Sequence, residues 1–205
     1  MRRFFFIVTC MSRRLTRKHW ISLLITLVVA IAAYGNQQGW FDSVEQGVMT
    51  NQPGLYPVDH SVDGDTIVVN MNGTKETIRF IGIDTPETHK PNTPVQCYGP
   101  AAAAYTKNRI TAAGNKVRLV SDSLSTNRDR YNRLLRYVYL PDGTNLNEQI
   151  VSNGYGFYYP YFPFSKKSQF AAAEKTAMDA KKGLWGNCTP TPSDDGGYKM
   201  DELAQ

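Results

Sequence analysis

A run of short β-like segments between residues 56 and 83 is the strongest constraint on how this chain can fold. The segments are rich in Val and Ile, have the length of ordinary strands, and cover residues 56–62, 66–71 and 76–83. Asn72-Gly73 joins the last two and favours a tight hairpin, because both residues adopt positive φ readily. The sequence therefore predicts that the domain begins with a β-meander.

The chain beyond this meander alternates predicted helices with two further strands, over 116–121 and 134–140. Pro100 and Gly114 bound one helix, with Pro at the start and Gly at the end in the favoured order. Further helices are predicted over 145–153 and over 165–182, the latter capped by Ser165. Five strands and about three helices predict an α+β, mainly β fold: a small, partly open barrel of the OB type.

Length and composition limit the chain to one domain with tails. It has 205 residues, of which 41% are hydrophobic and 20% charged, and this excludes collagen, a disordered chain and a multi-span membrane protein. Residues 36–55 and 189–205 are polar and contain Gly and Pro, so we expect a linker and a flexible tail. The folded domain is expected at 56–188.

The net charge of +5 is unevenly distributed. Six of the 23 Lys and Arg residues, and no Asp or Glu, lie in residues 1–35, which leaves residues 36–205 with a net charge of −1. The basic character of the whole chain is therefore no evidence for a polyanionic ligand. Affinity for nucleic acid has to come from individual, well-placed cations or from a bound metal.

An export element is predicted in residues 1–35. The apolar segment 20–34 follows the basic cluster RRLTRK, and Ala30-Ile31-Ala32 offers a small-x-small cleavage site. As a helix, the segment spans roughly 22 Å, which is less than a bilayer core. It is either a cleaved signal peptide or a membrane anchor, and both place the domain outside the cytoplasm, secreted or tethered. The chain starts at Met1 or at Met11, because either Met begins a basic segment.

Export also affects the interpretation of the cysteines. Cys10 lies in the segment expected to be removed, which leaves Cys97 and Cys188 in a compartment that permits disulfides. We expect these two to form one bridge, closing a loop of about 90 residues. The alternative is two free thiols. The domain is expected to be a monomer.

Three clusters of residues carry candidate chemistry: Asp63-Gly64-Asp65-Thr66, Arg79 with Ile83-Asp84-Thr85-Pro86-Glu87, and Asp129-Arg130-Tyr131-Asn132-Arg133. Carboxylates set among arginines suit metal-assisted phosphodiester cleavage. Hard oxygen ligands select Ca²⁺ or Mg²⁺, and a free carboxylate can accept a proton from water. Guanidinium groups match a phosphate that gains charge in the transition state.

Each cluster alone has a simpler explanation. The DGDT and DTPE segments are compatible with ordinary turns and caps. Arg79 can simply pair with a carboxylate on a neighbouring strand, and DRYNR can be a charged hairpin loop.

Taken in series, the motifs are far more specific. Along the chain run VDGDTIVV, IRFIGIDTPET, VQCYGPAAAAYTKNRI, DRYNRLLRYVYL, LNEQIVSNGYG and AAEKTAMDAKKGLWGN. In this order and spacing, the chain closely resembles the staphylococcal nuclease (thermonuclease) family over residues 58–187. The resemblance implies a five-stranded OB-fold barrel with three helices that hydrolyses DNA and RNA with Ca²⁺, with little sequence specificity, and leaves 3′-phosphate ends.

The resemblance also implies roles for individual residues. Asp65 and Asp84 match the metal-binding carboxylates, and the carbonyl of Thr85 matches a further ligand. Glu87 matches the general base. Two arginines match those that contact the scissile phosphate, and a tyrosine matches one beside the nucleotide: Arg79, Arg133 and Tyr131.

Two features limit this correspondence. Asn132 stands where the family commonly has glycine, although Asn tolerates a left-handed backbone. The aromatic run 158–164 either stacks nucleobases or packs against the barrel. A noncatalytic OB-fold module that binds single-stranded nucleic acid is the alternative function, and the complete set of carboxylates and arginines argues against it.

Overall fold

The computed structural model describes residues 25–27, 54–88, 94–194 and 196–200. Residues 25–27 are helical and belong to a separate unit, residues 1–52. No helix among the described residues is long and apolar enough to cross a membrane. The rest of the predicted signal or anchor segment, and most of the predicted linker, lie outside the described residues.

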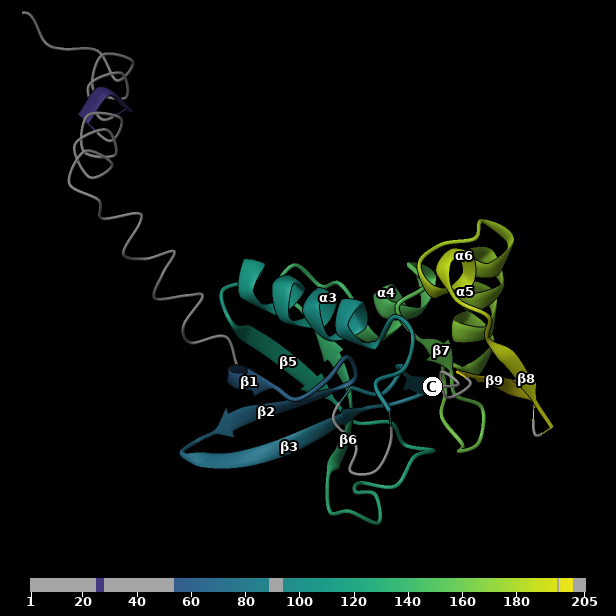
Figure 1. The fold of residues 1–205 in the computed structure, drawn as a ribbon. Helices are drawn as coiled ribbons and strands as arrows, with labels where there is room; N and C mark the ends of the chain where they lie inside the picture. Colours follow the sequence, from purple (N-terminus) through teal and green to yellow (C-terminus); the bar gives the residue numbers. More distant parts are fainter. Residues whose placement is uncertain (1–24, 28–53, 89–93, 195, 201–205) are drawn as a thin grey trace, which may run out of the picture. The chain divides into compact units, whose positions relative to one another are not determined.

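Five strands form the closed barrel on which the site is built (Figure 1). They are β1 (Leu55–Ser61), β2 (Thr66–Met71), β3 (Thr74–Phe80), β5 (Lys116–Val120) and β6 (Leu134–Tyr139). Their order is β1-β2-β3-β6-β5, with β3 parallel to β6 and the other pairs antiparallel. The predicted five-stranded OB-type barrel is confirmed, and pairing of β1 with β5 closes it completely.

The β2–β3 hairpin turns at Asn72-Gly73 as predicted. Both residues have positive φ, +54° and +93°, which is the conformation of a tight turn that follows the twist of the strands. The hairpin places Thr66 opposite Arg79 in the ladder. The start of β2 and the end of β3 are therefore neighbours.

Four helices accompany the barrel: α3 (Gly99–Ala112), α4 (Leu146–Ser152), α5 (Lys167–Asp179) and α6 (Leu184–Asn187). The short α6 follows Gly183, where the sequence predicted only the end of a helix. Asn145 caps α4 by accepting a hydrogen bond from the Glu148 N–H. Ser165 was predicted to cap the last helix, but this was wrong: α5 begins at Lys167, and the Ser165 hydroxyl donates to Asp122 instead.

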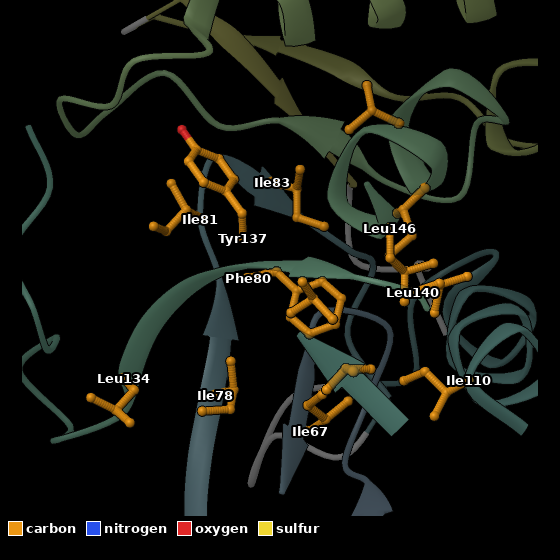
Figure 2. Close-up of a cluster of buried hydrophobic side chains, with 14 of the residues drawn as sticks. Ile67, Ile78, Phe80, Ile81, Ile83, Ile110, Leu134, Tyr137, Leu140 and Leu146 are labelled. Atoms are coloured by element: carbon orange, nitrogen blue, oxygen red, sulfur yellow. The ribbon is translucent and has the colours of Figure 1, made fainter. Parts of the chain in front are cut away.

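The hydrophobic core fills the barrel and continues under the helices. Ile67, Ile78 and Phe80 are buried inside the barrel. Figure 2 shows Ile110 of α3 and Leu146 of α4 reaching the same cluster. Helices α3 and α4 are thereby held against the strands.

Two small sheets complete the fold. β4 (Ile83–Asp84) pairs with β7 (Phe157–Tyr158), and β8 (Thr191–Ser193) pairs with β9 (Gly197–Lys199). The second sheet lies in the segment predicted to be a tail. Its end is buried, because Met200 packs with Phe157 and Leu184. The packed structure therefore continues twelve residues beyond the expected boundary at residue 188.

Candidate active site

One cavity of about 420 Å³ gathers the three sequence motifs. Its lining consists of Asp63, Asp65, Arg79, Asp84, Thr85, Pro86, Glu87, Tyr131 and Arg133. All seven residues with an implied role as metal ligand, general base, phosphate ligand or nucleotide contact lie in this set. The structure brings them together from three separate parts of the chain, while their individual roles stay predictions.

The β2–β3 pairing and β4 position the acidic residues. Asp65 directly precedes β2, and its carbonyl accepts a hydrogen bond from the Phe80 N–H at 2.9 Å. The chain then turns at Ile81-Gly82 into β4, which ends at Asp84. The two carboxylates expected to bind metal therefore lie on neighbouring segments, although 18 residues separate them in sequence.

Asp65 is buried and organises the segment after β4. Its Oδ2 accepts hydrogen bonds from the Thr85 N–H at 2.8 Å and from the Thr85 hydroxyl at 3.1 Å. Its Oδ1 accepts from the Thr66 hydroxyl at 3.0 Å. A carboxylate with this many donors is held in one orientation.

Gly64 is required for the close approach of the DGDT turn to Thr85. A methyl group at Gly64 would lie 2.8 Å from the Thr85 side chain, closer than packed atoms tolerate. The Gly64 carbonyl accepts a hydrogen bond from the buried Thr106 hydroxyl of α3 at 2.6 Å. The turn is therefore fixed between the helix and the segment after β4.

Arg79 pairs with both carboxylates expected to bind metal. One guanidinium nitrogen contacts Asp65 Oδ1, and the other lies 2.6 Å from Asp84 Oδ1. The Arg79 side chain is only 14% exposed, so these pairs are shielded from water. Pairing of Arg79 with a neighbouring carboxylate was the simpler interpretation of the sequence, and this pairing is present. It occurs inside the cavity that also contains the residues of the three motifs.

The cavity is acidic despite its two arginines. Four carboxyl groups face two guanidinium groups. Burial raises the pKa of Asp84, and the positive charge of Arg79 opposes this rise. The Asp84 side chain is nevertheless 45% exposed. Burial also raises the pKa of Asp63, again opposed by Arg79. An additional cation in the cavity favours the ionised form of both groups.

The donor atoms fit a hard divalent cation. Asp65, Asp84 and Thr85 offer carboxylate, hydroxyl and carbonyl oxygens, which suit Ca²⁺ or Mg²⁺. In the part of the chain that the structure describes, no three His, Cys, Asp or Glu side chains are already arranged as a metal site. The carboxylates are instead paired with Arg79.

Asp129 holds the loop that carries Arg133, and the sequence analysis assigned it no role. Its Oδ1 accepts from the N–H groups of Tyr131 and Arg133, both at 2.9 Å. Its Oδ2 accepts from Arg133 Nε at 2.7 Å. Asn132 has φ +64°, so the left-handed conformation expected at this position is present. The sequence signal that could have indicated this role is the position of Asp129 as the first residue of the D-x-Y-x-R pattern.

Asp63 lines the cavity and also had no predicted role. Its carboxylate accepts a hydrogen bond from the Asp65 N–H at 3.0 Å, which closes the DGDT turn. The motif contains Asp63, but a local turn explained it sufficiently at the level of sequence.

A second cavity of about 630 Å³ adjoins the first and shares Arg79, Tyr131 and Arg133 with it. Part of the aromatic run lines it. Phe162 is 62% exposed, whereas Phe164 is buried in the core. Tyr158 and Phe164, at the two ends of the run, therefore pack against the core, while Phe162 between them is exposed beside the groove. Stacking of nucleobases on the run stays a prediction.

A disulfide joins Cys97 to Cys188. It connects the segment before α3 with the end of α6, across 91 residues of sequence. Cys97 and Cys188 also pack beside Trp185 and Tyr198.

The barrel and its cavity define an OB-fold protein with the carboxylate and guanidinium groups that phosphodiester chemistry uses. Comparison with known proteins agrees with this class. The family model described as staphylococcal nuclease homologue matches residues 77–187. The chain therefore belongs to the staphylococcal nuclease family, as its motifs predicted.

Individual relatives extend the similarity beyond that range. The thermonuclease of Staphylococcus hyicus is 37% identical over 171 residues, 82% of this chain and 95% of that protein. The thermonuclease of Staphylococcus intermedius is 38% identical over 164 residues, 80% of this chain and 93% of that protein. Endonuclease YncB of Bacillus subtilis is 40% identical over 130 residues, 62% of this chain and 60% of that protein.

Proposed function

We propose that this protein is an exported nuclease that hydrolyses phosphodiester bonds of DNA and RNA with Ca²⁺ and little sequence specificity, leaving 3′-phosphate ends. One observation carries the proposal: two guanidinium groups and four carboxyl groups share a single open cavity. Membership of a nuclease family supports it. Degradation or scavenging of external nucleic acid is the corresponding biological role.

The two arginines bind the scissile phosphate in this proposal. Arg133 is oriented by Asp129 and lines both cavities, so it lies between the catalytic cavity and the groove. Arg79 lies deeper, between Asp65 and Asp84. Charge-assisted hydrogen bonds from both guanidinium groups strengthen as charge develops on the phosphoryl oxygens, and this selective strengthening lowers the barrier.

Glu87 accepts the proton of the attacking water. The water oxygen forms the new bond to phosphorus and the bond to the 5′-oxygen breaks. The leaving 5′-oxygen takes up a proton from solvent to become a hydroxyl, and the phosphate stays on the 3′-oxygen. The Glu87 carboxylate lines the cavity, and its Oε1 accepts a hydrogen bond from the Thr88 N–H at 3.1 Å. This hydrogen bond orients the carboxylate at the end of the Glu87 side chain.

Asp65, Asp84 and the carbonyl of Thr85 are the residues that would hold Ca²⁺. Ca²⁺ held there would supply positive charge to neutralise the phosphate in a cavity whose own carboxylates repel an anion. Release of Arg79 from its pairs with the two aspartates makes the guanidinium available to the substrate.

The adjoining groove accommodates the nucleotide. Tyr131 is 63% exposed and Phe162 is 62% exposed, so both side chains are accessible from the groove. Arg130 and Arg133 lie over the Tyr131 ring, 4.8 and 5.4 Å from its centroid. Stacking on aromatic rings accepts any base, which is consistent with low sequence specificity.

Two observations support export. The basic and apolar pattern of residues 13–34 is typical of a signal peptide or an anchor. The disulfide between Cys97 and Cys188 suits an oxidising compartment.

Digestion of plasmid DNA and of RNA by the purified full chain tests the function. Cleavage should require Ca²⁺, stop on addition of a chelator, and produce ends that a 3′-phosphatase must treat before a polymerase can extend them. Asp65→Asn and Arg133→Ala are expected to abolish or strongly reduce cleavage. Binding of single strands without cleavage, with Ca²⁺ present, would instead establish the noncatalytic OB-fold module.

A further inference from the structure

The backbone of Glu87 forms two hydrogen bonds with Gln96, nine positions further along the chain. The Glu87 N–H donates to Gln96 Oε1 at 2.8 Å, and the Gln96 N–H donates back to the Glu87 carbonyl at 2.9 Å. These two bonds join the ends of a segment whose middle, residues 89–93, lies outside the described residues. The position of Glu87 is thereby defined by Gln96 directly.

Packing against α3 reinforces this arrangement. The Gly99 N–H donates to the Gln96 carbonyl at 3.0 Å, so Gln96 is fastened to the start of the helix. A methyl group at Gly99 would lie 2.8 Å from the Glu87 carbonyl, so the chain at Glu87 passes directly over the helix start. Gln96 therefore joins the candidate base to a rigid element.

The other end of the Gln96 amide reaches the C-terminal segment. Its Nε2 donates to the Met200 carbonyl at 3.4 Å. The Glu87 N–H can only donate and the Met200 carbonyl can only accept, so a primary amide is the group that satisfies both. A glutamate keeps the first bond and loses the second, while a methionine of similar size loses both.

Covalent and aromatic contacts fix the same region. Cys97, next to Gln96, is bonded to Cys188. The segment that ends at Met200 is anchored by Tyr198, whose ring packs edge-on against Trp185 at 4.9 Å between centroids. The disulfide therefore holds the residue next to Gln96, and the residue that follows β9 is bonded to Gln96 itself.

We infer that Gln96 is the positioning residue for Glu87, and that the Cys97–Cys188 disulfide and the β8–β9 segment keep Gln96 in place. The inference rests on the proposed function for its catalytic consequence. Loss of this support displaces Glu87 from the attacking water while leaving the phosphate-binding arginines unchanged. The effect therefore falls on kcat and spares KM.

Two variants of the full chain separate the bonds of Gln96. Gln96→Met is expected to lower kcat by about tenfold to a hundredfold at nearly constant KM, since small misplacement of a catalytic group has effects of this size. Gln96→Glu keeps the acceptor for the Glu87 N–H and should recover most of that loss. Gln169→Met is the matched control, because Gln169 is an exposed residue of α5 that bonds only Glu148 and Lys166 in the described structure.

Reduction of the disulfide tests the support of Gln96 separately. Mild thiol reduction of the folded protein should lower kcat in the same direction as Gln96→Met, again without a change in KM. The double variant Cys97→Ala/Cys188→Ala should start at the reduced level and no longer respond to the reductant. A reduced protein with unchanged kcat would overturn the role assigned to the disulfide.

Amide hydrogen exchange at residue 87 gives a readout that needs no activity. Exchange should be at least about tenfold faster in Gln96→Met than in the wild type, and restored in Gln96→Glu. Unchanged exchange in Gln96→Met, or equally fast exchange in both variants, overturns the inference. If the wild type does not cleave nucleic acid, the proposed function fails, while this exchange pattern still decides whether Gln96 positions residue 87. If Gln96→Met does not fold, amide exchange at residue 87 is compared between Gln96→Glu and the reduced wild type. Faster exchange in the reduced protein supports the inference, and equal exchange overturns it.

Discussion

Arg79 lies 2.6 Å from Asp84 Oδ1, so a guanidinium expected to bind phosphate is paired with a carboxylate expected to bind metal. The same arginine contacts Asp65. In the proposed mechanism, substrate and a metal ion would therefore compete with an internal ion pair. Binding of the two together would separate the pair most easily, because the carboxylates would hold the metal and the guanidinium would hold the phosphate.

Substitution of Arg79 should consequently have opposite effects on metal binding and catalysis. Arg79→Ala removes a competing cation, so Ca²⁺ should bind more tightly to the substrate-free protein, as measured by calorimetric titration. The rate of plasmid cleavage should fall by about 100-fold to 1,000-fold, the range seen when one donor to a developing charge is removed. Weaker Ca²⁺ binding in this variant would show that Arg79 supports the metal ligands and does not compete with the ion.

Asp129 and Arg133 should behave as one unit. Asp129→Ala removes the acceptor of Arg133 Nε and of two backbone N–H groups, so the guanidinium loses its orientation. We expect cleavage to fall nearly as far in Asp129→Ala as in Arg133→Ala, and the double variant to be no worse than the worse single variant. Losses that simply add would show that Asp129 acts independently of Arg133.

Gly64→Ala should disturb the metal side of the cavity. The added methyl group would lie 2.8 Å from the Thr85 side chain, which has to shift. We expect a loss of about 1–3 kcal/mol in the free energy of unfolding, as for other overpacked sites, together with weaker Ca²⁺ binding. Thermal unfolding and calorimetric titration measure the two effects. Wild-type values for both would show that the DGDT turn can move away from Thr85 without cost.

Glu174 makes stability depend on pH. It is buried, and burial raises its pKa to about 7, opposed by a hydrogen bond from the Tyr158 N–H. Between about pH 4.5 and pH 7, the folded protein holds a proton that the unfolded chain releases, so stability falls as pH rises through this window.

Glu174→Gln keeps an acceptor for the Tyr158 N–H and carries no charge. It should raise the free energy of unfolding at pH 8 by about 2–3 kcal/mol and leave it nearly unchanged at pH 4. Denaturant unfolding at the two pH values measures this, with Glu148→Gln at a half-buried position as control. An equal effect of Glu174→Gln at both pH values would contradict the assignment.

Local pattern was sufficient for much of the barrel. Val and Ile content located the first three strands, Asn72-Gly73 indicated the hairpin, and Asn145 indicated the start of α4, because each of these signals acts within a few residues. Ser165 shows the limit of local signals. Its hydroxyl was free to cap α5 by sequence, but the distant Asp122 carboxylate takes it in the folded chain.

The motifs of the site were visible in the sequence, and their contacts were not. The order of DGDT, DTPE and D-x-Y-x-R indicated the family and the residues of one cavity. The supporting roles of Asp63 and Asp129 were not predicted from the sequence, because aspartates are common in turns and carry no functional signal alone. The segment after residue 188 was expected to be a tail, since its polar composition gives no sign that Met200 is buried.

By itself, the sequence determined which residue types are available and which elements they form, because strand propensity, turn geometry and motif spacing depend on near neighbours. Only the tertiary structure decided that Arg79 pairs with Asp65 and Asp84, and that Gln96 connects Glu87 to Met200. These contacts join residues up to 104 positions apart, and the closure of the barrel and the packing of α3, α6 and β9 create them.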